Sequence, residues 1–181
     1  MSHKSIFAWF SAAAFSFILI FPLERAESAY YQKIEPLFLN PLSVSSRTLT
    51  LRSDRYGKGY FGASRNGGRW HKGIDFLAPI GNPVLAAKSG RVLFSGEEKR
   101  GYGKYIQILH PDGLTTCYAH LSVLSVQSGD WVSKNQPIGN SGCSGNAKNV
   151  RIRPHLHFEV RDKAGALNPA PLMDPSIQII Q

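Results

Sequence analysis

From residue 79 onward the chain is a series of short apolar segments separated by turn residues, and this pattern limits the fold more than any other feature. Short segments rich in β-branched and aromatic residues, bounded by Gly, Pro, Asn or Asp, are typical of strands. No window shows a helical stripe longer than about two turns. We therefore predict a mostly β fold. The expected strands are residues 84–87, 91–95, 105–110, 114–120, 137–141 and 155–161.

The N-terminal end carries the pattern of a targeting segment. Lys4 precedes the apolar residues 6–23, and Ala26 and Ser28 offer small side chains at the two positions that a signal peptidase reads. We predict a signal peptide over residues 1–28. The apolar run is long enough at the margin to be a membrane helix, so an uncleaved anchor is the alternative. In both cases the rest of the chain is exported, and it contacts the membrane only if this segment stays in place.

The remaining chain is long enough for one domain with a proper core. Residues 29–59 carry prolines and a Ser/Thr-rich stretch, and we expect a leader that packs along the domain. Residues 60–172 are the predicted domain, and residues 173–181 are a C-terminal tail. Residues 111–113, Pro-Asp-Gly, are typical of a hairpin turn. His110, beside this turn, is expected to be solvated or to cap it.

The exported part is basic. Removing residues 1–28 takes away Lys4, Arg25, Glu24 and Glu27, so the formal net charge stays at +9. A basic protein can bind nucleic acid, but export favours cell-wall glycopeptide, acidic wall polymers or anionic lipid head groups as partners. No nucleic-acid partner is expected, because the strands lack interleaved aromatic and basic residues. A basic surface that is merely soluble is the other interpretation.

Residues 153–160, Arg-Pro-His-Leu-His-Phe-Glu-Val, place two histidines on one face of a predicted strand. Side chains at positions i and i+2 of a strand point the same way, so His155 and His157 share a face. Apolar residues alternate with them, which indicates a half-buried strand whose polar face lines a cleft. Two histidines in a cleft indicate metal binding or proton transfer; two hydrogen-bonded structural histidines are the alternative.

An imidazole and a carboxylate upstream add to this pair. His71 and Asp75 are ordinary zinc ligands, bound at about 2.0–2.2 Å. In an extended strand they would lie about 13 Å apart, too far for one ion, so the chain must bend, and Gly73 allows the bend. With His155 or His157 as the third ligand, the set is two histidines and one aspartate. A fourth position then stays open for water, as in catalytic zinc sites.

His120 lies at the end of the predicted strand 114–120. Alone it would be a polar strand end facing water, but beside the other histidines it is a candidate acid or base. Cys117 alternates with Tyr118 and is therefore expected to face away from the side that presents His120. Cys117 and Cys143 lie in an exported chain, where a disulfide is possible. Such a bridge requires Cα atoms within about 7 Å, so free thiols and a disulfide both stay open.

Three motifs carry a family resemblance: His71-Lys72-Gly73-Ile74-Asp75, Tyr118-Ala119-His120-Leu121 and Pro154-His155-Leu156-His157-Phe158-Glu159-Val160. In order and spacing they resemble the motifs of the lysostaphin-type zinc endopeptidases, also called LytM-domain peptidases. The likeness covers residues 60–170. It implies a single compact antiparallel β domain, sheet or sandwich-like, with zinc in a groove. It also implies an enzyme that cuts short peptides in bacterial peptidoglycan.

The resemblance also implies a role for each polar residue. His71, Asp75 and His157 would hold Zn²⁺, and His120 and His155 would line the groove as the pair that moves protons and stabilises the oxyanion. This division agrees with strand geometry, because residues at i and i+2 stand about 7 Å apart and need not both bind one ion.

The loop 142–153 departs from the family pattern, because it is longer than usual and carries three cations. We expect it to overhang the groove. Lys148, Arg151 and Arg153 would bind the carboxylates of peptidoglycan stem peptides, or they would belong to a solvated loop.

The leading hypothesis is a periplasmic or secreted, monomeric zinc endopeptidase that hydrolyses peptidoglycan cross-links. The alternative is a non-catalytic module of the same fold that binds and regulates another cell-wall hydrolase. The presence of all five polar residues favours the enzyme, because a regulator has no chemical reason to keep them.

Overall fold

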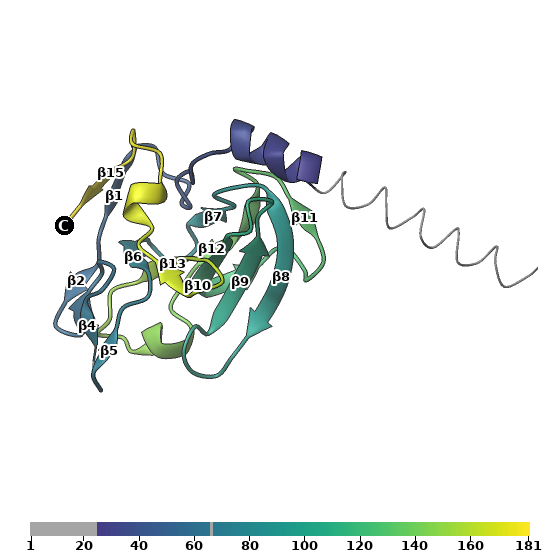
Figure 1. The fold of residues 1–181 in the computed structure, drawn as a ribbon. Helices are drawn as coiled ribbons and strands as arrows, with labels where there is room; N and C mark the ends of the chain where they lie inside the picture. Colours follow the sequence, from purple (N-terminus) through teal and green to yellow (C-terminus); the bar gives the residue numbers. More distant parts are fainter. Residues whose placement is uncertain (1–24, 66) are drawn as a thin grey trace, which may run out of the picture.

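A computed structural model of the chain describes residues 25–65 and 67–181, and it confirms a mostly β fold (Figure 1). Most of the predicted signal peptide 1–28 lies outside the described residues. Residues 25–34 are helical, so the predicted cleavage after Ser28 would fall within that helix. Among the described residues, no helix has the length and apolar character needed to cross a membrane.

The main sheet has nine strands, and all of its pairings are antiparallel, as predicted. Its strand order is β11-β8-β9-β10-β12-β7, and β13 pairs with β10, β14 and β6. The six predicted segments correspond to β7, β8, β9, β10, β12 and β13, and the last two have the predicted bounds. The strands are β6 (Ile74–Leu77), β7 (Pro83–Leu85), β8 (Gly90–Glu97), β9 (Lys104–Leu109), β10 (Thr115–Leu124), β11 (Trp131–Val132), β12 (Pro137–Ser141), β13 (His155–Arg161) and β14 (Ala166–Leu167).

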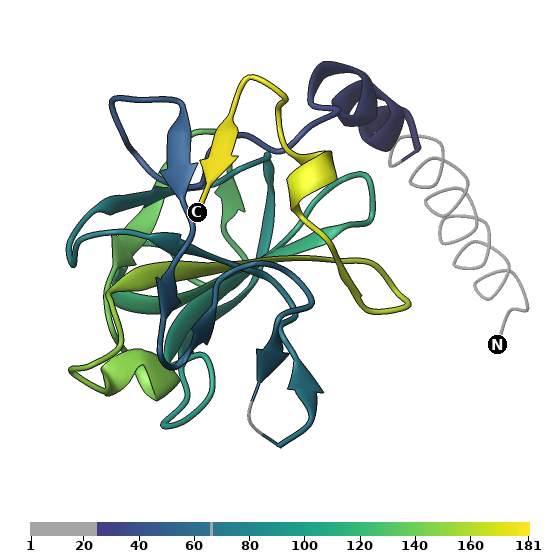
Figure 2. The same cartoon turned by 90° about the vertical axis from the view of Figure 1, so that its left-hand side faces the viewer.

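Three small two-stranded sheets lie on one side of the main sheet, next to β6 (Figure 1). β1 (Thr48–Thr50) and β15 (Gln178–Ile180) run parallel and lie side by side, joining the leader to the C-terminal end of the chain (Figure 2). The hairpins β2–β3 and β4–β5 precede β6. They comprise β2 (Ser53–Asp54), β3 (Gly57–Lys58), β4 (Ser64–Arg65) and β5 (Arg69–Trp70); two short 3₁₀ helices are η1 (Gly145–Lys148) and η2 (Ala170–Leu172).

The apolar face of β13 forms the centre of the core. Leu156, Phe158 and Val160 are buried, and the β6 residues opposite the first two are Phe76 and Ile74. Each large apolar side chain buried in this way contributes about 1.5–3 kcal/mol relative to an exposed one. The leader adds side chains to the same core, namely Phe38, Leu42, Leu49 and Leu51.

Strand β10 changes its partner at His120. Its residues 115–119 pair with β13, whereas residues 121–124 pair with β12. The register with β9 also shifts between Tyr118 and Leu121, and His120 has a φ of 63°. A bulge of this kind re-aims a side chain. The His120 ring consequently lies 5.8 Å from the His157 ring, between centroids.

The expected orientation of Cys117 is wrong for this reason. Directly opposed residues of an antiparallel pair share a face, and Cys117 lies opposite Glu159 while Ala119 lies opposite His157. Cys117 therefore lies on the face of the site, and His120 joins that face through the bulge rather than through regular alternation. Cys117 and Cys143 are both free, so they form no disulfide.

His110 follows the β9 strand, and the turn 111–113 begins directly after it. The backbone bonds from Gly113 to His110 and from His110 to Leu114 close this hairpin as predicted. The expectation of a solvated His110 is wrong, because its side chain is buried. Nδ1 donates to the Ser89 carbonyl at 2.9 Å, and the Thr116 hydroxyl lies 2.9 Å from Nε2. Burial lowers the pKa of His110 to about 4.

This pKa predicts a loss of stability in acid. The unfolded chain takes up the proton near pH 6.5, whereas folded His110 resists it down to about pH 4. The contribution is therefore present above pH 6.5 and is lost as the pH falls toward 4, by roughly 3 kcal/mol. Urea unfolding of wild type and His110→Gln between pH 7 and pH 4 measures it: the fall should be shallower in the variant. Parallel curves would contradict this account.

Candidate metal centre and active site

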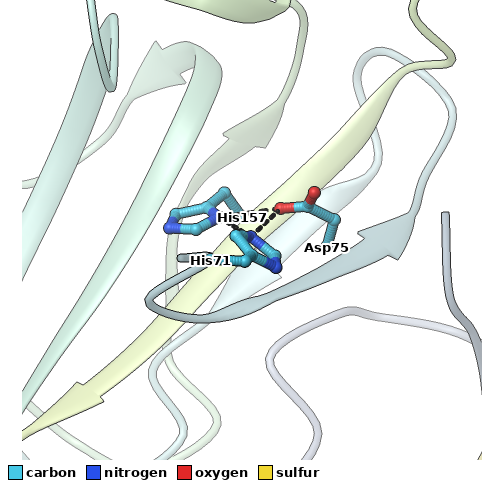
Figure 3. Close-up of side chains that lie close together, drawn as sticks. All are labelled: His71, Asp75 and His157. Atoms are coloured by element: carbon cyan, nitrogen blue, oxygen red, sulfur yellow. Dashed lines mark hydrogen bonds and ion pairs between the residues drawn. The ribbon is translucent and has the colours of Figure 1, made fainter. Parts of the chain in front are cut away.

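Asp75, His157 and His71 meet at one point in the interior (Figure 3). The antiparallel register places Asp75 of β6 directly opposite His157 of β13. Asp75 Oδ1 lies 2.7 Å from His157 Nδ1 and 2.9 Å from His71 Nε2. The two nitrogens are 3.0 Å apart. Two ligands of one zinc ion, each at about 2.0–2.2 Å, cannot lie more than about 4.4 Å apart, and all three pairs satisfy this limit.

Gly73 produces the predicted bend through its lack of a side chain. A Cβ atom at this position would lie 2.3 Å from the Phe158 carbonyl oxygen and 2.8 Å from Cγ of Glu159. The backbone of residue 73 therefore lies against β13, and this close approach brings His71 back over Asp75. The backbone conformation of Gly73 is not left-handed, so space rather than φ demands glycine here.

The tautomers of both histidines are set by partners outside the cluster. His71 Nδ1 lies 2.8 Å from the Tyr60 carbonyl oxygen, and His157 Nε2 lies 2.8 Å from Glu159 Oε1. These acceptors hold a proton on the outer nitrogen of each ring, which leaves His71 Nε2 and His157 Nδ1 as lone pairs. Two lone pairs and a carboxylate oxygen then face one another and require a positive charge between them. Two imidazoles and one carboxylate suit zinc, so the donor set fits this ion.

A proton on His157 Nδ1 is one source of this charge. Burial opposes ionisation of Asp75, but the hydrogen bond from His157 and the contact with His71 hold the pKa of its carboxyl well below the usual range. Burial also lowers the pKa of His157, yet its hydrogen bonds to Asp75 and Glu159 outweigh this effect and raise it to about 9. A metal ion would displace the proton on His157.

His120 and His155 lie beside this cluster with their rings 4.9 Å apart, between centroids. His155 Nδ1 lies 2.7 Å from the Arg153 carbonyl and His120 Nδ1 lies 3.0 Å from the Ser144 carbonyl, so each ring donates through Nδ1. The Nε2 atoms are left as acceptors, and that of His155 is 3.9 Å from Asp75 Oδ1. Burial lowers the pKa of His120 to about 3 and that of His155 to about 4, so both are neutral at pH 7.

Sequence reasoning missed a carboxylate behind His157. Glu159 is buried, and its Oε1 accepts hydrogen bonds from His157 and from the Tyr102 hydroxyl, both at 2.8 Å. Arg161 Nε donates to Oε2 at 2.6 Å. A carboxylate behind a metal-binding histidine orients the ring and raises its basicity. The signal was present in the sequence, because Glu159 follows His157 by two residues and so shares its face.

Two arginines on Asp75 were also missed. Arg52 and Arg65 both donate to Oδ2 of this carboxylate. No spacing in the sequence could indicate these contacts, because Arg52 lies just before β2 and Arg65 lies in β4. Their positions depend on how those segments fold against the site.

The structure places the basic loop 142–153 next to His120 and His155 through backbone contacts, from Ser144 and Arg153 respectively. The side chains of Lys148, Arg151 and Arg153 are exposed. Arg153 also borders a surface pocket next to the start of β13, whose other walls are Leu77, Ala78, Pro79 and Pro154. The loop thus contacts the site through its backbone, and the three exposed cations are not part of the cluster.

Two histidines and an aspartate that could hold a metal ion thus lie beside two further imidazoles on an antiparallel sheet. A sequence model of peptidase family M23 matches residues 69–169, which include all five polar residues of the site. The chain belongs to this family, and the resemblance to lysostaphin-type peptidases is confirmed.

Several proteins are similar to this chain in the matched region. The chain is 39% identical over 113 residues to the DD-carboxypeptidase/endopeptidase Mpg of Neisseria meningitidis serogroup B, covering 62% of this chain and 25% of Mpg. It is 37% identical over 109 residues to the murein hydrolase activator NlpD of Escherichia coli, covering 60% of this chain and 27% of NlpD. The catalytic domain of lysostaphin from Staphylococcus simulans superimposes with a TM-score of 0.54 at 36% identity, over 66% of this chain and 90% of that domain.

The ligand cluster predicts one zinc ion per chain. Removing the ion with a chelator should lower the melting temperature, because an ion bound only to the folded state stabilises it. Asp75→Asn and His157→Ala should each weaken zinc binding by more than about 100-fold, the upper end for a lost second-shell partner. Metal analysis and competition with a chromogenic chelator measure this.

His110→Gln serves as the control, because His110 is a buried histidine outside the cluster. It should bind zinc like the wild type. Full zinc content in His157→Ala would contradict the ligand set.

Proposed function

We propose that this domain is a zinc endopeptidase that hydrolyses the peptide cross-links of bacterial peptidoglycan. The observation that supports this most is the meeting of five polar side chains, His71, Asp75, His157, His120 and His155, in one buried site. A zinc ion held there supplies a Lewis acid that polarises a peptide carbonyl and makes water acidic enough to attack near neutral pH.

In this proposal His71, Asp75 and His157 hold the ion. The Tyr60 carbonyl and Glu159 keep the two imidazoles in the tautomer that presents a lone pair. Because these partners come from the protein backbone and from a buried carboxylate, the ligands are oriented before the ion arrives. Preorganisation of this kind is what a catalytic site requires, since no reorganisation is needed during the reaction.

His120 and His155 act on protons. Both are neutral at pH 7 and both present Nε2 as an acceptor, so either can take the proton from the water that attacks the scissile carbonyl. The imidazolium formed in this step then stabilises the oxyanion of the tetrahedral intermediate and gives its proton to the leaving amine. Burial strengthens these electrostatic effects, because water screens them less.

Cell-wall peptides are the proposed substrate class for two reasons. Mpg, a DD-carboxypeptidase/endopeptidase, and NlpD, a murein hydrolase activator, are both similar to this chain in the matched region. The net charge of +9 also suits an anionic polymer. Export through the predicted N-terminal segment would bring the domain to this substrate.

A regulator of another hydrolase is the second candidate, since the likeness to NlpD extends over 109 residues. The two functions differ in what the protein does alone. An endopeptidase releases fragments from purified peptidoglycan without a second enzyme, and mass analysis of these fragments identifies the bond that is cut. A regulator releases none alone but increases release by an added hydrolase. The complete set of five polar side chains favours the enzyme.

His155→Ala and His120→Ala should separate catalysis from metal binding. Each should reduce kcat by roughly 10²- to 10⁴-fold, the range for a lost general acid or base, and keep near-normal zinc content and melting temperature. The double variant should lose less than the product of the two effects, because both groups act on one transition state. Turnover of a cross-linked peptide and metal analysis on the same samples measure both quantities. If His155→Ala loses zinc while His157→Ala keeps it, the two roles are reversed.

The loop cations predict an effect on substrate binding. Changing Lys148, Arg151 and Arg153 together to Gln should raise KM for anionic stem peptides by roughly tenfold and leave kcat and zinc content unchanged, because exposed ion pairs contribute about 0.2–1 kcal/mol each. The salt dependence of KM should weaken as well.

A matched control changes three exposed cations outside the loop, Lys33, Arg47 and Lys163, to Gln. It removes the same charge and should leave KM near the wild-type value. An equal rise in KM in both triple variants would assign the effect to net charge rather than to this loop.

A further inference from the structure

The two oxygens of Asp75 have different partners. Oδ1 faces His71 and His157, as described above, whereas Oδ2 receives hydrogen bonds from Arg52 and Arg65. We propose that Arg52 and Arg65 form a clamp of two guanidinium groups that restricts Asp75 to metal binding through Oδ1 alone. This inference rests on the zinc site proposed above and assigns positioning roles to two residues outside the ligand set.

Hydrogen bonds from both its side chain and its backbone fix the position of Arg52. Its side chain is buried, and Nη2 and Nε lie 3.0 and 3.3 Å from Asp75 Oδ2. Nη1 donates to Asp54 Oδ2 at 2.7 Å, which balances part of the guanidinium charge. The backbone also takes part, because the Arg52 N–H donates to the Asp75 carbonyl at 2.8 Å. Arg52 therefore fixes both the main chain and the carboxylate of Asp75.

Arg65 reaches the same oxygen from the β4–β5 hairpin. Its Nη2 lies 2.9 Å from Asp75 Oδ2, and its Nη1 donates to the Lys58 carbonyl at 2.7 Å. Its side chain keeps 18% of its surface exposed, against 5% for Arg52. Two guanidinium groups on one oxygen repel each other, and a buried charge is costly unless it is paired. The two guanidinium groups stay close together because the negative charge of Asp75 lies between them.

The clamp has two chemical consequences. A carboxylate can bind a cation through one oxygen or both, and three N–H donors on Oδ2 leave only Oδ1 for the metal. The guanidinium charges also withdraw electron density from the carboxylate, which makes Asp75 a weaker donor and the bound ion a stronger Lewis acid. A low coordination number likewise keeps a position open for water and substrate, as catalytic zinc sites do.

The visible spectrum of the cobalt(II)-substituted full-length protein tests the clamp independently of turnover. Four-coordinate cobalt(II) absorbs visible light more strongly than five-coordinate cobalt(II). Wild type should give the stronger, four-coordinate spectrum. Arg65→Met should give weaker bands, because Asp75 then binds through both oxygens, and its zinc affinity should change by about 10- to 100-fold, the range for lost second-shell partners.

Further variants separate positioning from a structural effect. Arg65→Lys keeps the charge and a donor and should recover the wild-type spectrum more fully than Arg65→Met. Arg52→Met should show the same change as Arg65→Met, or it should fail to fold because Arg52 is buried, in which case the partly exposed Arg65 decides. Arg55→Met is the matched control, because Arg55 is an exposed arginine of the same segment that lies over the Tyr56 ring. It should keep the wild-type spectrum.

The outcomes are distinguishable from those of the proposed function. If wild type binds zinc or cobalt and Arg65→Met keeps the wild-type spectrum, the clamp is overturned and the zinc site stands, whatever the zinc affinity of the variant. If Arg55→Met changes the spectrum as much as Arg65→Met, the effect is one of charge in the segment, and the clamp is again overturned. If wild type binds neither metal, this result contradicts both the proposed function and the clamp.

Discussion

The pairing of β6 with β13 is the constraint on which the rest of the site depends. Its antiparallel register places Asp75 opposite His157 on one face, and Phe76 and Ile74 opposite Leu156 and Phe158 on the other. A shift by one residue would exchange the two faces and move the polar side chains into the core. The apolar packing of β13 therefore fixes the position of the metal ligands, and the stability of the core and the geometry of the site come from one interaction.

The two buried carboxylates of the site are stabilised by the same kinds of partner. Each of its two carboxylates directs one oxygen to an imidazole and the other to a guanidinium: Asp75 contacts His157 and Arg52, and Glu159 contacts His157 and Arg161. A buried carboxylate without such partners would take up a proton instead of staying ionised. With them, both acids stay charged, and His157 lies between two anions. The two ionised carboxylates thus create a demand for positive charge at His157, and this demand exists before any ion binds.

Local patterns in the sequence predict much of this arrangement. The period of two along 155–161 and the turn residues at 111–113 indicate strands and a hairpin that the structure contains. What local patterns miss is contact between distant segments. The arginines on Asp75 lie 23 and 10 residues before it, and the bulge at His120 depends on the divergence of β12 and β13. For the same reason alternation assigned Cys117 to the wrong face.

His120 shows how the fold maintains a conformation that the residue itself disfavours. A left-handed backbone at a non-glycine residue costs about 1–2 kcal/mol. His120 stays there because its N–H donates to the Tyr102 carbonyl and its ring to the Ser144 carbonyl. Those two carbonyls belong to separate loops, which meet where a Cβ on Gly145 would lie 2.3 Å from the Gly103 nitrogen. Any side chain at either glycine would push the loops apart and release His120. Two glycines outside the ligand set therefore determine where this imidazole points.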